Sequence, residues 1–404
     1  MNSYYIYKKD EIKYLENEYK VSLPHKLSLN DYIDFKRNIF INIQGKYNIT
    51  VTNKNSVEYE NIFTNNHISY KYSYTRYDSY INYSNFCNDF YKLEKNNHYK
   101  SKVFFTNSGM SAITSLLLAI NTVLDDFSFL LPDEDIYFET YDFYNKYIKD
   151  KNNINKNILY IDTIAKKFDI KRYINLINNN DNIFAVVIDT TCFLPNELNK
   201  LISSVINKNL LCVLVRSHTK LDMMGSEISS LGSLVYLIPR KTDNEKFQII
   251  KRIISESYYL LGKFGALCLP DKFPEFIFDK KFKKINNQRI KQIENNNYKL
   301  YTFLKDNIKK GKIILPKHQK FILYVLNEKL DNECQSNIIE NSIKLFVNKN
   351  EKLFYACSFG FDYIALDSYY DINEKNYVMR ISMNDDENNV DIFNEIKEFI
   401  NDNF

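Results

Sequence analysis

The sequence predicts an α/β fold with a mostly parallel central sheet, helices on both faces and a smaller C-terminal α+β domain. From about residue 100, short runs rich in β-branched and aromatic residues alternate with helical patterns, which is typical of parallel α/β units. The length of 404 residues exceeds one compact core and favours two or three domains. Hydrophobic residues make up 45% of the chain and aromatic residues 15%, so large cores can form.

The predicted secondary structure follows this alternation through the middle of the chain. Val, Ile, Leu and Phe dominate the runs assigned to strands, and apolar residues recur at helical spacing between them. Strands are predicted at 102–106, 127–131, 158–161, 184–189, 210–215 and 233–238, and helices at 111–123, 142–149 and 196–207.

The flanking regions complete the expected domain organisation. Residues 1–70 are polar and Tyr-rich, with one helix expected after Ser28, and are assigned to an N-terminal segment. Residues 71–250 are assigned to the large domain, and a long helix from Thr242 to about Leu261 is expected to lead into a C-terminal domain, 251–404. There the sequence predicts strands at 321–326 and 378–382 and helices at 335–342 and 390–400.

Composition argues against several classes of function. The 54 basic and 50 acidic residues are interleaved, so no concentrated basic surface for nucleic acid is expected. The six cysteines are widely spaced without a zinc-binding pattern, which is typical of reduced thiols in the cytoplasm. No run of about 18 apolar residues predicts a membrane span, and the N-terminal region lacks the apolar core of a signal peptide. We therefore expect a cytoplasmic protein without a nucleic-acid, membrane or metal site.

A candidate phosphate-binding turn lies between the first predicted strand and its helix, at Ser108, Gly109 and Met110. A Ser-Gly turn that opens a helix presents backbone N–H groups and the positive end of the helix dipole, which suits a phosphate group. The same pattern also serves as an ordinary helix N-cap.

A candidate reactive lysine, Lys220, ends the segment Ser217-His218-Thr219-Lys220, which follows the buried strand predicted at 210–215. A lysine at the end of a buried strand is unusual, because desolvation of its ammonium group is unfavourable. Desolvation lowers the pKa of the amine and favours the neutral form that reacts with carbonyl groups. Ser217 and Thr219, beside it, offer hydroxyl donors to a phosphate. A lysine that simply extends into solvent is the alternative.

Three further side chains have the right chemistry for a cofactor-dependent site on an amino acid. Asp189 closes the strand before Lys220 and is able to pair with a protonated ring nitrogen or to act as a turn aspartate. Arg380, in the strand VMRIS, suits bidentate capture of a carboxylate or a surface salt bridge. Tyr137 is able to stack on a flat ring and to transfer a proton, although the chain has 33 tyrosines.

In order and spacing, these motifs resemble the cystathionine γ-synthase and methionine γ-lyase family, the Cys/Met-metabolism branch of the fold-type I pyridoxal-phosphate enzymes. The resemblance extends over residues 74–400. The matching segments are Tyr74-Thr75-Arg76 (Tyr-Ser-Arg in the family), Ser108-Gly109-Met110-Ser111-Ala112-Ile113 (Ser-Gly-Met-Ala-Ala-Ile), Asp135-Ile136-Tyr137-Phe138-Glu139-Thr140-Tyr141 (Asp-Leu-Tyr-Gly-Gly-Thr-Tyr), Ser217-His218-Thr219-Lys220 (Ser-Ala-Thr-Lys), Ser358-Phe359-Gly360 (Ser-Leu-Gly) and Arg380-Ile381-Ser382 (Arg-Leu-Ser).

The resemblance implies a role for each matched position. Lys220 would form the Schiff base with pyridoxal 5'-phosphate and carry protons, and Tyr137 would stack on the cofactor. Arg380 and Ser358 would bind the substrate carboxylate. The phosphate would contact Ser108, Gly109, Met110, Ser217 and Thr219, with Tyr74 and Arg76 reaching the site of a neighbouring subunit.

The sequence also departs from the family pattern. Phe138 and Glu139 replace glycines after the stacking tyrosine, and Met223-Met224 replaces the Gly-Gly that follows the lysine segment. The stretch from Asn157 to Lys220 is short by about one strand–helix unit. Asp189 is then either the partner of the pyridine nitrogen or a residue of the preceding strand, which would leave that role unfilled. We prefer the first, with Asp222 as a second candidate.

The resemblance implies an enzyme that catalyses elimination or replacement at the γ- or β-carbon of an amino acid, and the departures from the family pattern favour a specialised amino-acid or natural-product pathway. A homodimer or homotetramer with shared active sites would be the assembly. A pyridoxal-phosphate-dependent aminotransferase or another lyase on the same fold stays open, and so does a non-catalytic binding module, because fold alone does not decide the reaction.

Overall fold

The structure, a computed structural model, divides the chain into two compact units. Unit 1 consists of Met1–Asn42, Lys220–Ile228 and Asp279–Phe404, and unit 2 of Ile43–Thr219 and Ser229–Phe278. The sequence-based ranges 1–70, 71–250 and 251–404 stay predictions of domains, and the compact units divide the chain at other positions. The structure describes residues 8–23, 28–44, 62–65, 68–71, 80–93, 98–131, 136–148, 156–228, 230–326, 333–371 and 374–404.

Unit 2 is built on a six-stranded sheet with the order β4-β9-β8-β7-β6-β5. The neighbouring strands β5, β6, β7 and β8 are parallel, and β9 runs antiparallel to both β8 and β4. The strands are β4 (Tyr99–Thr106), β5 (Ser128–Leu130), β6 (Asn157–Asp162), β7 (Ile183–Asp189), β8 (Leu211–Ser217) and β9 (Gly232–Pro239).

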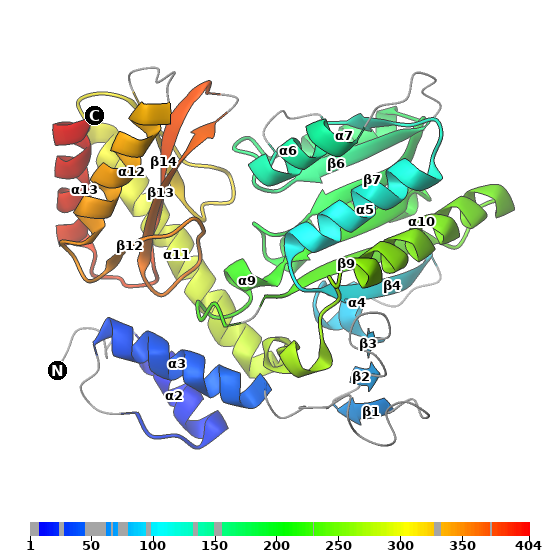
Figure 1. Ribbon diagram of the computed structural model, residues 1–404, viewed down its shortest axis with the longest axis horizontal. Helices are drawn as coiled ribbons and strands as arrows, with labels where there is room; N and C mark the ends of the chain where they lie inside the picture. The colour runs from blue at the N-terminus through cyan, green and yellow to red at the C-terminus, as the bar shows by residue number, and fades with distance from the viewer. Residues whose placement is uncertain are drawn as a thin grey trace. The chain divides into compact units, whose positions relative to one another are not determined.

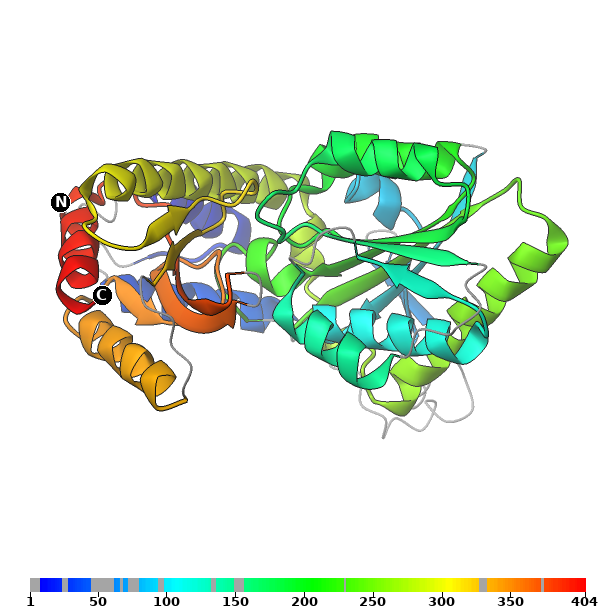
Figure 2. The ribbon, with the colours of Figure 1, turned by 90° about the horizontal axis from the view of Figure 1, so that it is seen from above.

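Helices cover both faces of this sheet, as Figure 2 shows. One face carries α5, α6 and α10, and the other carries α7 and α8. Every residue of β7 is buried, as expected for a central parallel strand covered on both sides. The helices are α5 (Gly109–Val123), α6 (Phe138–Tyr147), α7 (Ile170–Asn179), α8 (Asn199–Asn207), preceded by the 3-10 turn η2 (Pro195–Leu198), and α10 (Asn244–Lys263).

Unit 2 also contains short elements at its two sequence borders. The strands β1, β2 and β3 form an antiparallel three-stranded sheet. These elements are β1 (Ile62–Asn65), β2 (Ile68–Lys71), β3 (Tyr80–Tyr83), α4 (Phe86–Asp89), η3 (Pro270–Lys272) and η4 (Glu275–Phe278), and α9 (His218–Leu221) spans the border between the units.

Unit 1 has a smaller five-stranded sheet with the order β10-β11-β14-β13-β12, in which only β12 and β13 pair in parallel. Its core joins apolar side chains of the sheet to those of the three C-terminal helices. Figure 1 labels its elements, which are α2 (Lys9–Tyr19), α3 (Leu29–Gln44), α11 (Lys280–Asn307), α12 (Glu333–Val347), α13 (Val390–Asn403), β10 (Lys312–Ile314), β11 (Ile322–Val325), β12 (Leu353–Tyr355), β13 (Ile364–Asp371) and β14 (Asn376–Ser382).

The predicted strands and helices are confirmed in type throughout the described residues, with shifted ends. The helix expected at 142–149 spans Phe138–Tyr147, and α3 begins where Ser28 predicted it. The Ser28 hydroxyl accepts the N–H of Asp31 at 3.2 Å while the Asp31 carboxylate accepts the N–H of Ser28 at 3.2 Å, a reciprocal cap. Helix α2 and the long helix α11 went unpredicted because charged and Asn-rich residues interrupt their apolar faces.

Candidate functional site

The predicted phosphate turn forms the N-terminus of α5, a helix of 15 residues in unit 2. The backbone of Ser108 is extended, and its hydroxyl oxygen accepts the N–H of Ser111 at 3.0 Å. The Ser111 hydroxyl donates to the side-chain oxygen of Asn107 at 2.6 Å. Because the first N–H groups of a helix have no acceptor within the helix, this turn presents donors suited to an anion.

Gly109 allows the end of β8 to approach this turn. A Cβ atom built on Gly109 would lie 2.8 Å from the Cβ of Ser217 and 3.0 Å from its Cα, closer than ordinary packing allows. Any larger side chain would push Ser217 away. The structure therefore brings together Ser108, Gly109, Met110 and Ser217, which the sequence assigned to one phosphate site.

The strands β6, β7 and β8 end in side chains that suit a polar site. In the sheet register Asp162 pairs with Asp189, and Asp189 pairs with Val215, two residues before Ser217. Asp189 thus ends the strand beside the one that leads to Lys220, which is the arrangement that the preferred register requires. One oxygen of Asp189 accepts the N–H of Thr191 at 2.9 Å.

Asp162 is a candidate that sequence reasoning missed. Its carboxylate accepts the backbone N–H of Tyr137 at 2.9 Å and that of Ile164 at 3.0 Å, so it holds the predicted stacking tyrosine at the start of α6. Burial, together with the carboxylates of Asp162 and Asp189, raises the pKa of Tyr160 well above its ordinary value. The available signal was the strand NILYID, which ends in Ile-Asp as FAVVID does.

His218 and Thr219 are part of the structural end of β8. His218 is fully buried, with Nε2 2.9 Å from the hydroxyl of Ser233 and its ring against Phe90. The Thr219 hydroxyl accepts the N–H of Leu231 at 3.5 Å. Its burial and its contact with Ser233 give His218 a structural role at the end of β8.

Lys220 is the first residue of the segment 220–228 in unit 1 and is half-buried. Its Nζ lies 5.2 Å from the ring centroid of Phe359, within range of a cation–π interaction. A Cβ atom on Gly360 would lie 2.3 Å from the Lys220 carbonyl oxygen, and Gly360 has φ +88. The segment Ser358-Phe359-Gly360 therefore packs directly on Lys220, and glycine is required at its last position.

Arg380 is buried in β14 and paired with an acid that the sequence analysis did not name. Its Nε donates to one oxygen of Asp367 at 2.9 Å, and its Nη2 donates to the other at 2.6 Å. The rings of Phe321 and Tyr369 lie against the guanidinium, 5.5 and 5.6 Å from its central carbon. Phe321 also contacts Phe359, which lies under Lys220. The two site residues of unit 1 are thus joined by aromatic contacts.

The remaining sequence-based expectations concern the neighbouring subunit, metal ions, membranes and cysteines. Tyr74 and Arg76 lie outside the described residues. Within the described ranges, no cluster of three or more His, Cys, Asp or Glu side chains suits a metal ion. No described helix is both long and apolar enough to cross a membrane. The described cysteines Cys87, Cys192, Cys212, Cys268 and Cys357 are free thiols.

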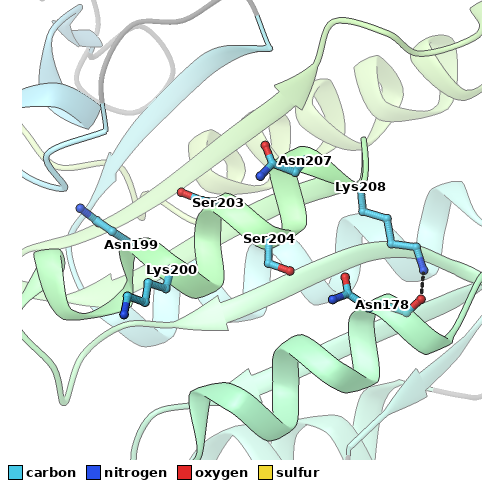
Figure 3. Close-up of a pocket in the computed structure, with 7 residues that line it drawn as sticks. All are labelled: Asn178, Asn199, Lys200, Ser203, Ser204, Asn207 and Lys208. Carbon is cyan, nitrogen blue, oxygen red and sulfur yellow. Dashed lines mark hydrogen bonds between the residues drawn. The ribbon is translucent and has the colours of Figure 1, made fainter.

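A hollow of about 800 Å³ lies between α7 and α8 and contains none of the predicted site residues (Figure 3). Its Lys208 donates to the carbonyl oxygens of Ile177 and Asn178 at 2.7 and 2.8 Å, so it caps the end of α7. This lysine is already used to complete the helix, and we assign the hollow no ligand.

Comparison with solved structures identifies the fold. A proposed aspartate aminotransferase from Leishmania major Friedlin aligns with a TM-score of 0.50 and 9% identity, over 94% of this chain and 87% of that chain. A proposed O-acetylhomoserine (thiol)-lyase from Campylobacter jejuni, whose structure holds a pyridoxyl-lysine, aligns with a TM-score of 0.47 and 14% identity over 74% and 81% of the two chains. A methionine γ-lyase from Micromonospora echinospora aligns with a TM-score of 0.44 and 12% identity, over 74% of this chain and 80% of that chain.

The chain has the fold of the fold-type I pyridoxal-phosphate enzymes, and the predicted fold class is confirmed. No family model and no curated protein matches the sequence. Identities this low show the fold alone, so the reaction has to be argued from the side chains.

Proposed function

We propose that this chain is a pyridoxal-phosphate-dependent enzyme that acts on an amino acid and catalyses elimination or replacement at its γ- or β-carbon. The observation that carries the proposal is the close approach of Gly109 and Ser217. It joins a helix N-terminus suited to a phosphate to the end of the strand that continues, after Thr219, into Lys220.

The residues of unit 2 fit the cofactor. The N-terminal amides of α5 and the hydroxyls of Ser108, Ser217 and Thr219 are the donors that a phosphate monoester requires. Asp189 ends a neighbouring parallel strand and supplies the carboxylate for a protonated ring nitrogen. Pyridoxal phosphate, when bound, supplies an electron sink for negative charge on the substrate's α-carbon.

The remaining roles belong to the chain's own acids, bases and cations. Lys220 holds the cofactor through its amine and carries the α-proton of the substrate. Tyr137 would stack on the cofactor ring and transfer a proton to or from the leaving group. Arg380, with Ser358, would bind the substrate carboxylate, and in this chain its guanidinium is paired with Asp367.

A covalent-capture experiment tests the cofactor assignment. Purified protein is incubated with pyridoxal phosphate, reduced with borohydride and digested, and the modified peptide is identified by mass. The adduct is expected on Lys220 and is expected to be lost in Lys220→Ala but kept in Lys200→Ala, a change at an exposed lysine of α8. Equal labelling of wild type and Lys220→Ala would contradict the proposal.

A second assay separates the reaction classes. Release of a 2-oxoacid from an amino acid with a β- or γ-leaving group, without an amino acceptor, supports elimination. Stoichiometric conversion of the cofactor to its amine form supports an aminotransferase instead. Cofactor binding without turnover across a broad screen of amino acids supports the binding module.

We also propose that the protein is a homodimer or homotetramer in which Tyr74 and Arg76 complete a neighbour's site. The support is the resemblance of the segment Tyr74-Thr75-Arg76 to the family's Tyr-Ser-Arg. A monomer in light scattering at working concentration would remove this assignment.

A further inference from the structure

The segment 221–226, which follows Lys220, is buried and has an unusual backbone. Met224 has φ +50 and Gly225 has φ +75, both in the left-handed region. That region disfavours residues with a side chain, and the pattern of the resembling family has glycine at the Met224 position. Something in this chain therefore has to hold Met224 in place.

Lys36 supplies such a contact from helix α3. Its Nζ donates to the Met224 carbonyl at 2.6 Å and to the Glu11 carboxylate at 2.8 Å, and it pairs with Asp362. The side chain is fully buried. A charged donor on a backbone carbonyl is a strong hydrogen bond in such surroundings.

The acids around Lys36 form a balanced cluster with two other buried cations. Lys8 donates to Asp362 at 2.7 Å and to Asp385 at 2.9 Å, and Arg289 pairs with Asp362 at 3.3 Å. Although burial opposes it, Lys36, Lys8 and Arg289 lower the pKa of Asp362 far below its ordinary value. The cluster of Lys8, Glu11, Lys36, Arg289, Asp362 and Asp385 thus holds three charges of each sign.

The same cluster reaches the other side of Lys220. Arg289 Nη1 donates to the Gly360 carbonyl at 2.9 Å, and Gly360 packs on the Lys220 carbonyl. Asn286 holds the next carbonyl, that of Leu221, at 2.7 Å. The backbone of Lys220 is therefore fixed on both sides by side chains of α3 and α11.

We propose that Lys36 is a positioning residue for Lys220, which it fixes by holding the Met224 carbonyl. The N-terminal helices α2 and α3 then belong to the catalytic apparatus of unit 1, whereas the sequence assigned residues 1–70 to a separate segment. The role of Lys220 rests on the proposed function, and the anchoring of its segment does not.

Two double variants isolate the contact. The Lys36 double variant combines Glu11→Gln with Lys36→Met, and the Lys8 double variant combines Glu11→Gln with Lys8→Met. Each variant removes one positive and one negative charge from the cluster. Only the first loses the hydrogen bond to the Met224 carbonyl, which Lys36 donates, whereas Lys8 donates to Glu11, Asp362 and Asp385. Denaturant unfolding of both variants provides the measure of their global stability.

Hydrogen exchange of the cofactor-free full chain measures directly how firmly the segment 221–226 is held. Amides of residues 221–226 are expected to exchange at least about tenfold faster in the Lys36 double variant than in the Lys8 double variant. The Ser226 amide, which donates to the Met223 carbonyl at 3.0 Å, is the best reporter. Equal exchange in both variants would overturn the proposal.

A pH titration of the visible absorbance band of bound pyridoxal phosphate tests whether the Lys220 amine keeps its position, because the midpoint depends on the surroundings of that amine. Its pH midpoint is expected to shift in the Lys36 double variant and to stay at the wild-type value in the Lys8 double variant. A common midpoint in both variants would also overturn the positioning role. Failure of the wild type to capture pyridoxal phosphate would overturn the proposed function, and exchange would still decide the anchoring.

A milder pair of variants applies where the Lys36 double variant does not fold. Arg37, on the same helix, donates to the Ser226 carbonyl at 3.0 Å and pairs with Glu227 at 2.7 Å. Arg37→Ala is expected to speed exchange at residues 226–228 and to shift the band's midpoint. Asp34→Ala removes only the weaker Arg37–Asp34 contact at 3.7 Å and serves as the control. Identical behaviour of the two would count against anchoring by α3.

Discussion

Arg380 and Asp367 form a bidentate ion pair across the neighbouring strands β14 and β13, with distances of 2.9 Å from Nε and 2.6 Å from Nη2. Both side chains are buried, and two aromatic rings flank the guanidinium. The pair is electrically neutral, so a substrate carboxylate that binds Arg380 adds a negative charge to a buried site. If Arg380 binds the substrate carboxylate as proposed, the negative charge of Asp367 opposes that binding.

The two partners of this pair are expected to differ in their effect on stability. Arg380→Met leaves a buried carboxylate without its cation and is expected to lower the free energy of unfolding by about 3–5 kcal/mol. Asp367→Asn also leaves a buried charge, that of Arg380, but the amide keeps an acceptor for the guanidinium and two aromatic rings lie against it, so a smaller loss of about 1–3 kcal/mol is expected. Denaturant unfolding measures both. Equal losses would show that the attraction within the pair outweighs its desolvation.

The affinity for an amino acid is expected to increase as the pH falls. Burial raises the pKa of Asp367 above its ordinary value, although Arg380 and Lys220 oppose this shift. Because the pKa of Asp367 in the folded protein is higher than its ordinary value, its buried negative charge is unfavourable above that pKa. The charge is neutralised as the pH falls through that pKa. Once Asp367 is protonated, it no longer forms an ion pair with Arg380, and the guanidinium is available to the substrate carboxylate. The affinity for the amino acid then increases by at most about tenfold per pH unit.

Substrate titrations of wild type and Asp367→Asn over a range of pH check this expectation. The variant is expected to bind more tightly at neutral pH and to lose most of the pH dependence. Parallel pH profiles of the two proteins would exclude Asp367 as the titrating group.

The strands of unit 2 and the positions of its motifs were predictable from local sequence. Buried parallel strands such as β7 are continuous apolar runs, and Ser108 and Ser217 stand at element ends that these runs define. Motifs at strand ends are found reliably when the strand itself gives a strong signal.

The buried charges were not predictable in the same way. Lys8 and Lys36 lie in a polar N-terminal region, where charged residues normally indicate solvent, and their partner Asp362 is more than 300 residues away. The pairing of Arg380 with Asp367 depends on the register of β13 and β14, which composition does not fix. Such contacts arise from tertiary structure alone.

Gly109→Ala is expected to disturb the phosphate turn. The added methyl group would lie 2.8 Å from the Ser217 Cβ, and the strain is expected to lower the free energy of unfolding by about 1–3 kcal/mol. Because Ser217 must move, binding of inorganic phosphate and of pyridoxal phosphate should weaken together. Thr122→Ala, at an exposed position of the same helix, should change stability by about 0.5 kcal/mol or less. Unchanged phosphate affinity in Gly109→Ala would separate this turn from the phosphate site.

Asp189 and Asp162 are expected to differ in their effect on the cofactor, and the comparison tests the preferred register, in which Asp189 is the partner of the ring nitrogen. Asp189→Asn removes the charge proposed to pair with the ring nitrogen and is expected to weaken binding of pyridoxal phosphate by about 10- to 100-fold. Asp162→Asn keeps an acceptor for the Tyr137 N–H, at 2.9 Å in the wild type, and is expected to weaken binding less. Titration of each variant with pyridoxal phosphate, followed by its absorbance, gives the two affinities. A larger loss in Asp162→Asn would transfer the role of the ring-nitrogen partner to β6, one strand further from β8.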